Sequence, residues 1–203
     1  SGGANACTGE EGYQQTVRTA EAVALMMHVE PSEIAVCSTG LIGELLPLDK
    51  VIEGAQKAFD SLDSSAQAGS DAAHAIMTTD TKPKTVNRLG SNEFRIGGMV
   101  KGSGMIAPQL ATMLCVITTD AVVSAGQLQA ALTAAVDRSF NRIDVDGCMS
   151  TNDTVLLLAS GASGITPDPD EFNGLVADCC SSLARQIIGD GEGASHDIRI
   201  RGT

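Results

Sequence analysis

The chain has 203 residues, enough for one large domain or two small ones, and its 43% hydrophobic content is sufficient for a sizeable core rather than a disordered chain. The formal net charge is -12 and aromatic residues make up 2%. This composition argues against nucleic-acid and anionic-membrane surfaces, which need basic patches, and against base-stacking platforms, which need aromatic rings. No apolar run reaches the roughly 18 residues of a membrane span, and no signal-peptide pattern is visible.

The six cysteines are spaced in a way that indicates free thiols. They are Cys7, Cys37, Cys115, Cys148, Cys179 and Cys180. None forms a Cys-x-x-Cys pair or lies near a histidine at the spacing of a metal site. Four have apolar neighbours, among which a free cysteine packs as a small core residue. Because disulfides are rare in the cytosol, we expect reduced thiols in a cytosolic protein.

The amino-terminal part of the chain predicts a helix followed by a short strand. Thr8 begins a Thr-x-x-Glu sequence with the spacing of a capping box, so a helix is expected from there to about His28. Residues 34–38 form a short apolar run, which predicts a buried strand. This strand is expected to end at Thr39 and Gly40, where the chain leaves it in a turn.

Two helices and a hairpin are expected next. A proline well placed for a helix start predicts a helix over residues 47–62, and a capping serine predicts a short one over residues 70–76. Residues 85–89 and 93–99 flank a Gly-Ser-Asn sequence. Strand-forming runs around such a turn predict a hairpin.

Strands and helices continue to alternate in the rest of the chain. Strands are expected at residues 112–118, 154–159 and 196–201, and helices at residues 124–141 and 168–188. Residues 154–159 are apolar at most positions, which is typical of a strand buried on both faces. The alternation predicts a layered α/β fold. A strand with nothing after it indicates a segment of a longer protein.

Four glycines fall within eight positions of the segment 97–104, which indicates tight turns or close backbone approach. Gly102-x-Gly104 followed by Ala107 matches a loose dinucleotide fingerprint. That motif must open a helix, and a strand is already expected near Thr112, so the fingerprint is rejected. A phosphate-binding loop is rejected too, because Lys101 is not followed by serine or threonine.

Other motif-like features have ordinary explanations. Residues 144–147 begin like a calcium loop, but the twelfth position would be Val155, where a glutamate is required. We therefore expect an aspartate-rich turn. The histidines form no pair at metal-ligand spacing; they are His28, His74 and His196. No Gly-x-Ser-x-Gly sequence is present, so a nucleophile elbow is absent.

Three features remain, and each alone is commonplace. The sequence around Thr39-Gly40 leaves a strand in a turn whose backbone N–H groups can form an oxyanion site. Lys101 lies inside the glycine segment, where a solvated lysine is the ordinary expectation. Ala111-Thr112 stands at the start of a strand, a frequent place for threonine.

Taken in order, six blocks of the sequence carry a resemblance. They are SGGANACTG at 1–9, CSTGLIG at 37–43, HAIMTTD at 74–80, KGSGMIAPQLATMLC at 101–115, TTDA at 118–121 and STNDTVLLL at 150–158. The chain resembles the ornithine acetyltransferases, also called bifunctional arginine-biosynthesis proteins or glutamate N-acetyltransferases. The blocks cover most of the chain in the order of that family.

The resemblance implies a fold and a division of the chain. The fold is α/β, with mixed β-sheets sandwiched by helices, of the DmpA-like, amino-terminal-nucleophile type. Residues 1–203 form one catalytic region that is incomplete at both ends relative to the family. Self-cleavage between Ala111 and Thr112 leaves residues 1–111 as the α-chain part and residues 112–203 as the β-chain part.

The resemblance also assigns the site. Thr112 becomes the amino terminus of the second chain and the acyl-accepting nucleophile, and its own freed α-amine can serve as the base. Thr39 and Gly40 match positions that stabilise the oxyanion. The positions that hold the amino-acid substrate are Thr78, Lys101, Thr112 and Glu192. No metal and no cofactor is expected.

The implied reaction moves the acetyl group of N2-acetylornithine to glutamate by ping-pong transfer through acetyl-threonine, with acetyl-CoA as a further donor left open. After cleavage, two α and two β chains are expected to form a heterotetramer in the cytoplasm, without nucleic-acid or membrane partners. Two alternatives remain: an autocatalytic aminopeptidase or amidohydrolase that releases the acyl group to water, and an inactive fragment.

Overall fold

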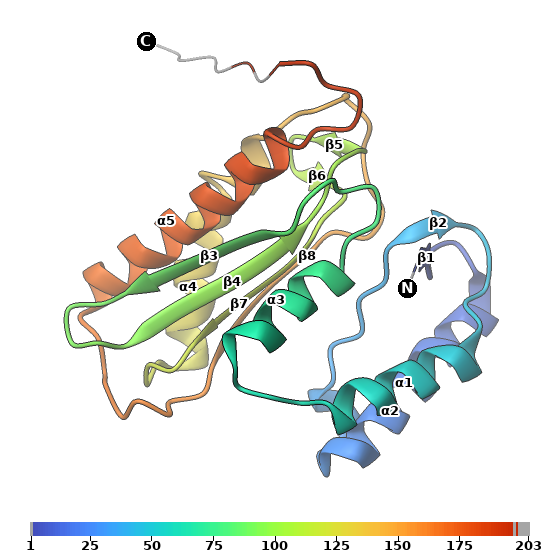
Figure 1. The fold of residues 1–203 in the computed structure, drawn as a ribbon, viewed down its shortest axis with the longest axis horizontal. Coiled ribbons are helices and arrows are strands. Elements are labelled where there is room, and N and C mark those ends of the chain that lie inside the picture. Colours follow the sequence, from blue (N-terminus) through green and yellow to red (C-terminus); the bar gives the residue numbers. More distant parts are fainter. Residues whose placement is uncertain (1, 197, 199–203) are drawn as a thin grey trace. The chain divides into compact units, whose positions relative to one another are not determined.

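The chain divides into two compact units in this computed structural model, which describes residues 2–196 and residue 198, with the backbone alone at Leu110 and Ala111 (Figure 1). The first unit spans Ser1–Ala72 and the second Ala73–Thr203. The strand expected at residues 196–201 falls almost entirely outside the described residues.

The first unit contains a pair of packed helices and a short parallel strand pair. The helices are α1 (Gly9–Met27) and α2 (Leu48–Asp60), and the strands are β1 (Gly2–Ala4) and β2 (Gly40–Ile42). Both expected helices are therefore confirmed. A short 3-10 helix (Pro31–Glu33) follows α1, which ends at His28 in the left-handed conformation.

The capping box expected at Thr8 is not formed. Thr8 occupies the N-cap position, but its backbone lacks the extended conformation that capping requires, with φ -103° and ψ 7°. Its hydroxyl donates instead to Asn5 Oδ1 at 2.5 Å. Asn5 also donates from Nδ2 to the carbonyl of Gly12 at 2.7 Å, so this asparagine is bonded both to Thr8 and to the beginning of α1.

The strand expected at residues 34–38 is wrong. These residues adopt no regular structure, and Val36 remains 37% exposed. Pairing begins only after them, where Thr39 forms a bridge with Gly3 and β2 then runs beside β1. A strand needs a neighbouring strand to form hydrogen bonds with its backbone groups, and the available partner, β1, pairs with residues 40–42 instead.

The second unit is built on a four-stranded mixed sheet in the order β3-β4-β7-β8. The first three of these strands are antiparallel and β8 runs parallel to β7. The strands are β3 (Lys84–Leu89), β4 (Arg95–Lys101), β7 (Leu114–Thr119) and β8 (Thr154–Ala159). Helices α4 (Ala125–Val136) and α5 (Pro169–Ile188) cover one face of this sheet (Figure 1). The predicted hairpin and layered α/β architecture are confirmed.

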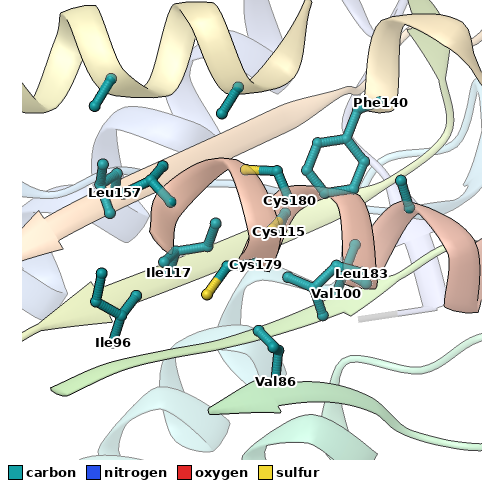
Figure 2. Packing of buried hydrophobic residues seen from close by; sticks show 14 of the residues in the cluster. Val86, Ile96, Val100, Cys115, Ile117, Phe140, Leu157, Cys179, Cys180 and Leu183 are labelled. Carbon is teal, nitrogen blue, oxygen red and sulfur yellow. The ribbon is translucent and has the colours of Figure 1, made fainter. Parts of the chain in front are cut away.

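The core of the second unit lies between this sheet and α5 (Figure 2). Ile117 and Leu183 are both fully buried there. The register places Gly98 directly opposite Ile117 on the neighbouring strand. A Cβ at Gly98 would lie 3.1 Å from Ile117 Cγ1 and 3.4 Å from Leu183 Cδ1, so the missing side chain lets α5 approach the sheet closely.

The cysteines are unpaired, and three of them belong to this core rather than the four expected. Cys115, Cys179 and Cys180 are buried, and the other three are exposed. Burial raises the pKa of Cys179 to about 11 and that of Cys180 to about 12. These thiols therefore pack as small apolar groups (Figure 2).

Helices α3 (Ala66–Ala75) and α4 differ in their bounds from the sequence expectation. Helix α3 begins one turn earlier than expected, because Ser65 Oγ, rather than Ser70, accepts a hydrogen bond from the amide of Ala68 at 3.2 Å. Helix α4 is capped by Ser124 and begins where expected, but it ends at Val136 instead of residue 141, and a 3-10 helix (Phe140–Arg142) follows.

Strand β8 has the expected bounds but is not buried on both faces. Leu157 is 9% exposed, whereas Leu158 is 52% exposed. The sheet order places β8 at one end of the sheet, so it has a neighbouring strand on one side. Among the described residues, no helix is long and apolar enough to cross a membrane.

Candidate active site

The glycine segment after β4 folds back on itself and brings Thr112 beside Gly102. Between Gly102 and Thr112 the chain forms a short antiparallel hairpin, whose strands β5 (Ile106–Ala107) and β6 (Leu110–Ala111) have two residues each. The amide of Thr112 donates to the carbonyl of Met105 at 2.8 Å. A Cβ at Gly102 would lie 2.8 Å from the carbonyl oxygen of Thr112, so this approach requires glycine.

Thr112 itself precedes the strand instead of opening it, since β7 begins at Leu114. Its hydroxyl oxygen is buried and has no hydrogen-bond partner among the described residues. An unsatisfied buried polar group costs about 1–3 kcal/mol, so such a group in a native fold calls for an explanation. Thr112 is also the residue that the sequence resemblance implies as the nucleophile.

Asp146, in the turn at residues 144–147, forms hydrogen bonds with the backbone that follows the glycine segment. Its carboxylate accepts hydrogen bonds from the amides of Met105 at 2.8 Å and Ile106 at 3.1 Å. The expected aspartate-rich turn is confirmed, because Gly147 donates to Asp144 Oδ1 at 2.9 Å. Within the part of the chain that the structure describes, no group of side chains is arranged to hold a metal ion.

Lys101 is a buried lysine, so the expectation of a solvated side chain is wrong. The residue is 2% exposed and stands at the end of β4, opposite Leu114. Its Nζ lies 3.9 Å from Asp80 Oδ2. Burial lowers the pKa of Lys101, while the nearby carboxylates of Asp80 and Glu192 act in the opposite direction.

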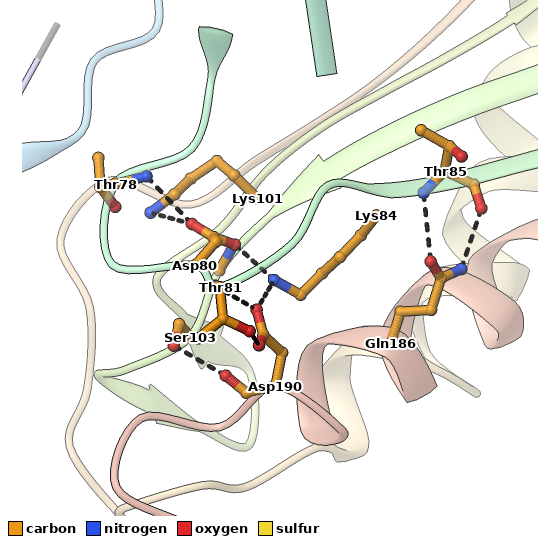
Figure 3. Close-up of polar contacts among 10 residues, drawn as sticks. Thr78, Asp80, Thr81, Lys84, Thr85, Lys101, Ser103, Gln186 and Asp190 are labelled. Carbon is orange, nitrogen blue, oxygen red and sulfur yellow. Dashed lines mark hydrogen bonds and ion pairs between the residues drawn. The ribbon is translucent and has the colours of Figure 1, made fainter. Parts of the chain in front are cut away.

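Asp80 lies at the centre of a buried polar network (Figure 3). Its carboxylate accepts hydrogen bonds from the amide of Gly102 at 2.7 Å and from the amide of Thr78 at 3.1 Å. Lys84 Nζ donates to the same carboxylate at 2.6 Å and to Asp190 Oδ2 at 2.5 Å. Although burial by itself raises the pKa of Asp80, the donors bonded to it hold the pKa below its usual value.

Asp190 connects the segment after α5 to the glycine segment by hydrogen bonds. Its side chain accepts from the amide of Thr81 at 3.0 Å, and its backbone carbonyl accepts from the Ser103 hydroxyl at 2.8 Å (Figure 3). Two residues later, the amide of Glu192 donates to the carbonyl of Ser103 at 2.8 Å. The network therefore fixes both backbone segments that carry the expected substrate-binding charges.

Glu192 lies on the exposed side of this arrangement, with its carboxylate against the glycine segment. A Cβ at Gly104 would lie 2.6 Å from Glu192 Oε2, so a larger residue there would push the end of the Glu192 side chain away from the glycine segment. A cavity of about 590 Å³ opens beside it; its polar lining includes Thr79, Thr81, Ser103, Asp190 and Glu192. The space is large enough for an amino acid and is bordered by the segments that the network holds.

Thr39 and Gly40 lie in the first unit. Thr39 is 5% exposed, and Gly40 has φ +129°. A Cβ at Gly40 would lie 2.2 Å from the backbone carbon and oxygen of Gly2, so any other residue would displace β1. The expectation that this pair leaves a strand is wrong: Thr39 and Gly40 introduce β2.

The structure thus brings Thr78, Lys101, Thr112 and Glu192 around the glycine segment of the second unit. Sequence reasoning missed the residues that hold them, which are Asp80, Lys84, Ser103 and Asp190. One signal was present. In β3, Lys84 alternates with Val86 on the inward face, where a lysine requires a buried carboxylate.

Comparison with known proteins identifies a family for this chain. The model of the ArgJ family matches residues 1–203. Over 200 residues the chain is 76% identical to the arginine biosynthesis bifunctional protein ArgJ of Bifidobacterium longum, covering 98% of this chain and 51% of that protein. Over 205 residues it is 52% identical to the protein of the same name from Mycobacterium leprae, covering 98% of this chain and 50% of that protein.

A solved structure agrees with these relatives. The ornithine acetyltransferase from Mycobacterium tuberculosis, complexed with ornithine, is 44% identical, with a TM-score of 0.51 over 55% of this chain and 59% of that one. This likeness confirms the expected fold class, α/β with mixed sheets of the ornithine acetyltransferase type. The chain spans about half the length of the curated relatives it matches. Because the family model matches from residue 1 to residue 203, this chain belongs to the ArgJ family.

Proposed function

We propose that the full-length protein containing this chain is a self-cleaving acetyltransferase of arginine biosynthesis. It moves the acetyl group from N2-acetylornithine to glutamate, with Thr112 as the nucleophile. The observation that carries the proposal is the buried, unpartnered hydroxyl of Thr112 at the close approach to Gly102. The names of the relatives and the ornithine bound to the solved structure support the same substrate class.

Self-cleavage begins when Thr112 Oγ attacks the carbonyl carbon of Ala111. The peptide C–N bond breaks as the ester C–O bond forms, and the hydroxyl proton passes to the departing α-amine. Water then hydrolyses the ester, which frees the carboxylate of Ala111 and the amine and hydroxyl of Thr112. The freed amine has an ordinary pKa of about 7.7–8.0, so a useful neutral fraction near pH 7 can act as base.

Turnover uses the same hydroxyl twice. Thr112 Oγ attacks the acetyl carbonyl of N2-acetylornithine, and ornithine leaves with the proton on its α-amine. Glutamate then enters, its neutral α-amine attacks the acetyl-threonine ester, and N-acetylglutamate leaves as the hydroxyl is restored. Donors at Thr39 and Gly40 stabilise both tetrahedral oxyanions in this proposal. One site serves two amino acids in succession, so ping-pong kinetics follow.

Charge complementarity explains the choice of substrate. Lys101 provides the cation for the α-carboxylate that both amino acids share, and Glu192 provides an anion for the amine of the ornithine side chain. Thr78 precedes Asp80 by two residues and donates from its amide to the Asp80 carboxylate, and it completes the proposed binding set. A cation placed beside the nucleophile is notable in a chain of net charge -12.

Incubation of the full-length protein with N2-acetylornithine and labelled glutamate tests the reaction. Labelled N-acetylglutamate supports the transferase. Free acetate instead identifies the alternative hydrolase, and no product from a correctly cleaved protein contradicts both activities. Replacing N2-acetylornithine with acetyl-CoA tests the second donor, which the word bifunctional in the names of the relatives favours.

The assembly belongs to the same proposal. Cleavage at Ala111–Thr112 is expected to leave two chains that remain together, and two such pairs form the heterotetramer. Intact mass spectrometry under denaturing conditions identifies the cut, and native mass spectrometry of the same sample identifies the assembly. A single uncut chain in an active sample contradicts the amino-terminal nucleophile.

A further inference from the structure

Four charged side chains lie buried beneath the glycine segment of the second unit. They are Asp80, Lys84, Lys101 and Asp190, and each residue is at most 7% exposed (Figure 3). A buried ion pair is weak evidence for stability, because apolar residues of the same volume often stabilise a fold as well or better. Their position directly behind the proposed site indicates that these charges serve the site.

Asp80 is the member of this set that contacts the site from two directions. One carboxylate oxygen accepts the hydrogen bond from the Gly102 amide at 2.7 Å, and the other lies 3.9 Å from Lys101 Nζ. Lys84 holds the carboxylate from β3 at 2.6 Å. A single carboxylate thus bridges the side chain of Lys101 and the backbone that follows it.

We infer that Asp80 is a positioning residue, whose carboxylate fixes the Lys101 ammonium and the Gly102 backbone so that Lys101 can bind the α-carboxylate of both amino acids. The inference rests on the proposed function, which gives Lys101 that binding role. Asp80 acts through Lys101 and contacts no substrate. Lys84 orients Asp80 and is one step further from the site.

The charges around Lys101 distinguish a positioning role of Asp80 from a role in stability alone. Among the described residues, the titratable groups that act on Lys101 are Asp80 before β3, Lys84 on β3 and Glu192 after α5. Burial lowers the pKa of Lys101, the carboxylates raise it, and the ammonium of Lys84 lowers it. Removing the charge of Asp80 must therefore move this pKa down, and removing the charge of Lys84 must move it up.

The first experiment measures the Lys101 charge directly, without substrate. Asp80→Asn and Lys84→Met are made in the full-length protein, and the Lys101 Cε signal is titrated by NMR with 13C-labelled lysine, assigned by its loss in Lys101→Met. We expect the midpoint to fall in Asp80→Asn and to rise in Lys84→Met. Both variants break the same Asp80–Lys84 ion pair, so midpoints that move together, or not at all, overturn the inference.

The second experiment measures binding of glutamate and N2-acetylornithine by calorimetry. Asp80→Asn is expected to raise the Kd of both amino acids about tenfold, because Lys101 loses the group that holds it. Lys84→Met keeps the charge of Asp80 facing Lys101 but removes one of the donors that orient it, so this variant is expected to raise both Kd values less than Asp80→Asn does, although both variants lower the melting temperature. Normal binding by Asp80→Asn overturns the inference.

If either single variant does not fold, the double variant Asp80→Asn/Lys84→Met removes one charge of each sign and is used instead. It is expected to bind both amino acids about tenfold more weakly, and normal binding by it overturns the inference. If the unaltered protein binds neither amino acid, the proposed function fails, while the NMR titration still decides the relation between Asp80 and Lys101.

Discussion

At the scale of single residues, the hydroxyl of Thr112 is the group with the sharpest expectation. Thr112→Ala removes the oxygen that attacks the Ala111 carbonyl, so the protein is expected to remain one chain and to transfer no acetyl group. A denaturing gel and the labelled-glutamate assay check both results. Thr112→Ser is the matched control, since it keeps a hydroxyl and is expected to be cleaved. Two bands from Thr112→Ala would contradict the assignment.

Thr39→Ala tests the oxyanion proposal. Charge on the oxyanion develops only in the transition state, so loss of a donor is expected to lower kcat by about 10²–10³ with little change in KM. Steady-state kinetics with N2-acetylornithine measure the two separately. A raised KM with unchanged kcat would mark Thr39 as an ordinary substrate contact.

The charges of Lys101 and Glu192 are expected to have different consequences. Lys101→Met keeps the length of the side chain and removes its charge, so glutamate and N2-acetylornithine should both bind about tenfold to a hundredfold more weakly. Glu192→Gln should weaken ornithine more than glutamate, whose own side chain is an anion. Calorimetry on the cleaved protein gives each Kd. Equal losses for both ligands in Glu192→Gln would remove Glu192 from side-chain recognition.

At the scale of elements, the strand pair of the first unit depends on the absence of a side chain at Gly40. Gly40→Ala places a Cβ 2.2 Å from backbone atoms of Gly2 at a φ of +129°, so β1 and β2 are expected to separate. Hydrogen exchange of their amides should become faster, and the melting temperature of the first unit should fall.

Gly54→Ala is the control for that change. Gly54 lies inside α2, where a Cβ would meet nothing within 4 Å, so alanine should stabilise the helix by up to about 1 kcal/mol. Equal effects of Gly40→Ala and Gly54→Ala would show that the close approach between β1 and β2 contributes nothing to stability.

At the scale of the whole molecule, buried carboxylates predict how stability depends on pH. The donors bonded to Asp80 and Asp190 outweigh burial and lower the pKa of both groups in the folded protein. A lowered folded pKa contributes stability that is present above the unfolded value near 3.8 and is lost as pH falls through the folded value. Thermal unfolding should therefore show a melting temperature that drops steeply below about pH 4.

Asp153 provides a comparison for Asp80, because the pKa values of the two carboxyl groups shift in opposite directions. Burial raises the pKa of Asp153, and its Oδ1 is buried with no partner among the described residues. This charge is unfavourable in the fold, so Asp153→Asn should raise the melting temperature at pH 7, whereas Asp80→Asn should lower it. Similar shifts in both variants would contradict the assignment of opposite pKa directions.

Much of the fold of the second unit was predictable because it depends on local signals. The hairpin around residues 90–92 forms at its turn sequence, and helices α4 and α5 begin within one residue of the expected positions, where Ser124 and Asp168 cap them. The strand expected at residues 34–38 does not form, because a strand requires a partner elsewhere in the chain. The capping box expected at Thr8 does not form because Thr8 lacks the extended backbone conformation of an N-cap, and its hydroxyl donates to Asn5.

The sequence by itself determined the elements that follow from periodicity, capping and turns. Its ordered blocks indicated the family, and the resemblance to that family implied the four residues that meet at the glycine segment. Only the tertiary structure decided that Lys101 is buried and that Asp80, Lys84 and Asp190 surround it. The physical reason is distance along the chain. Lys84 and Asp190 are 106 residues apart in sequence, and their ion pair exists only because β3 and the end of α5 pack together.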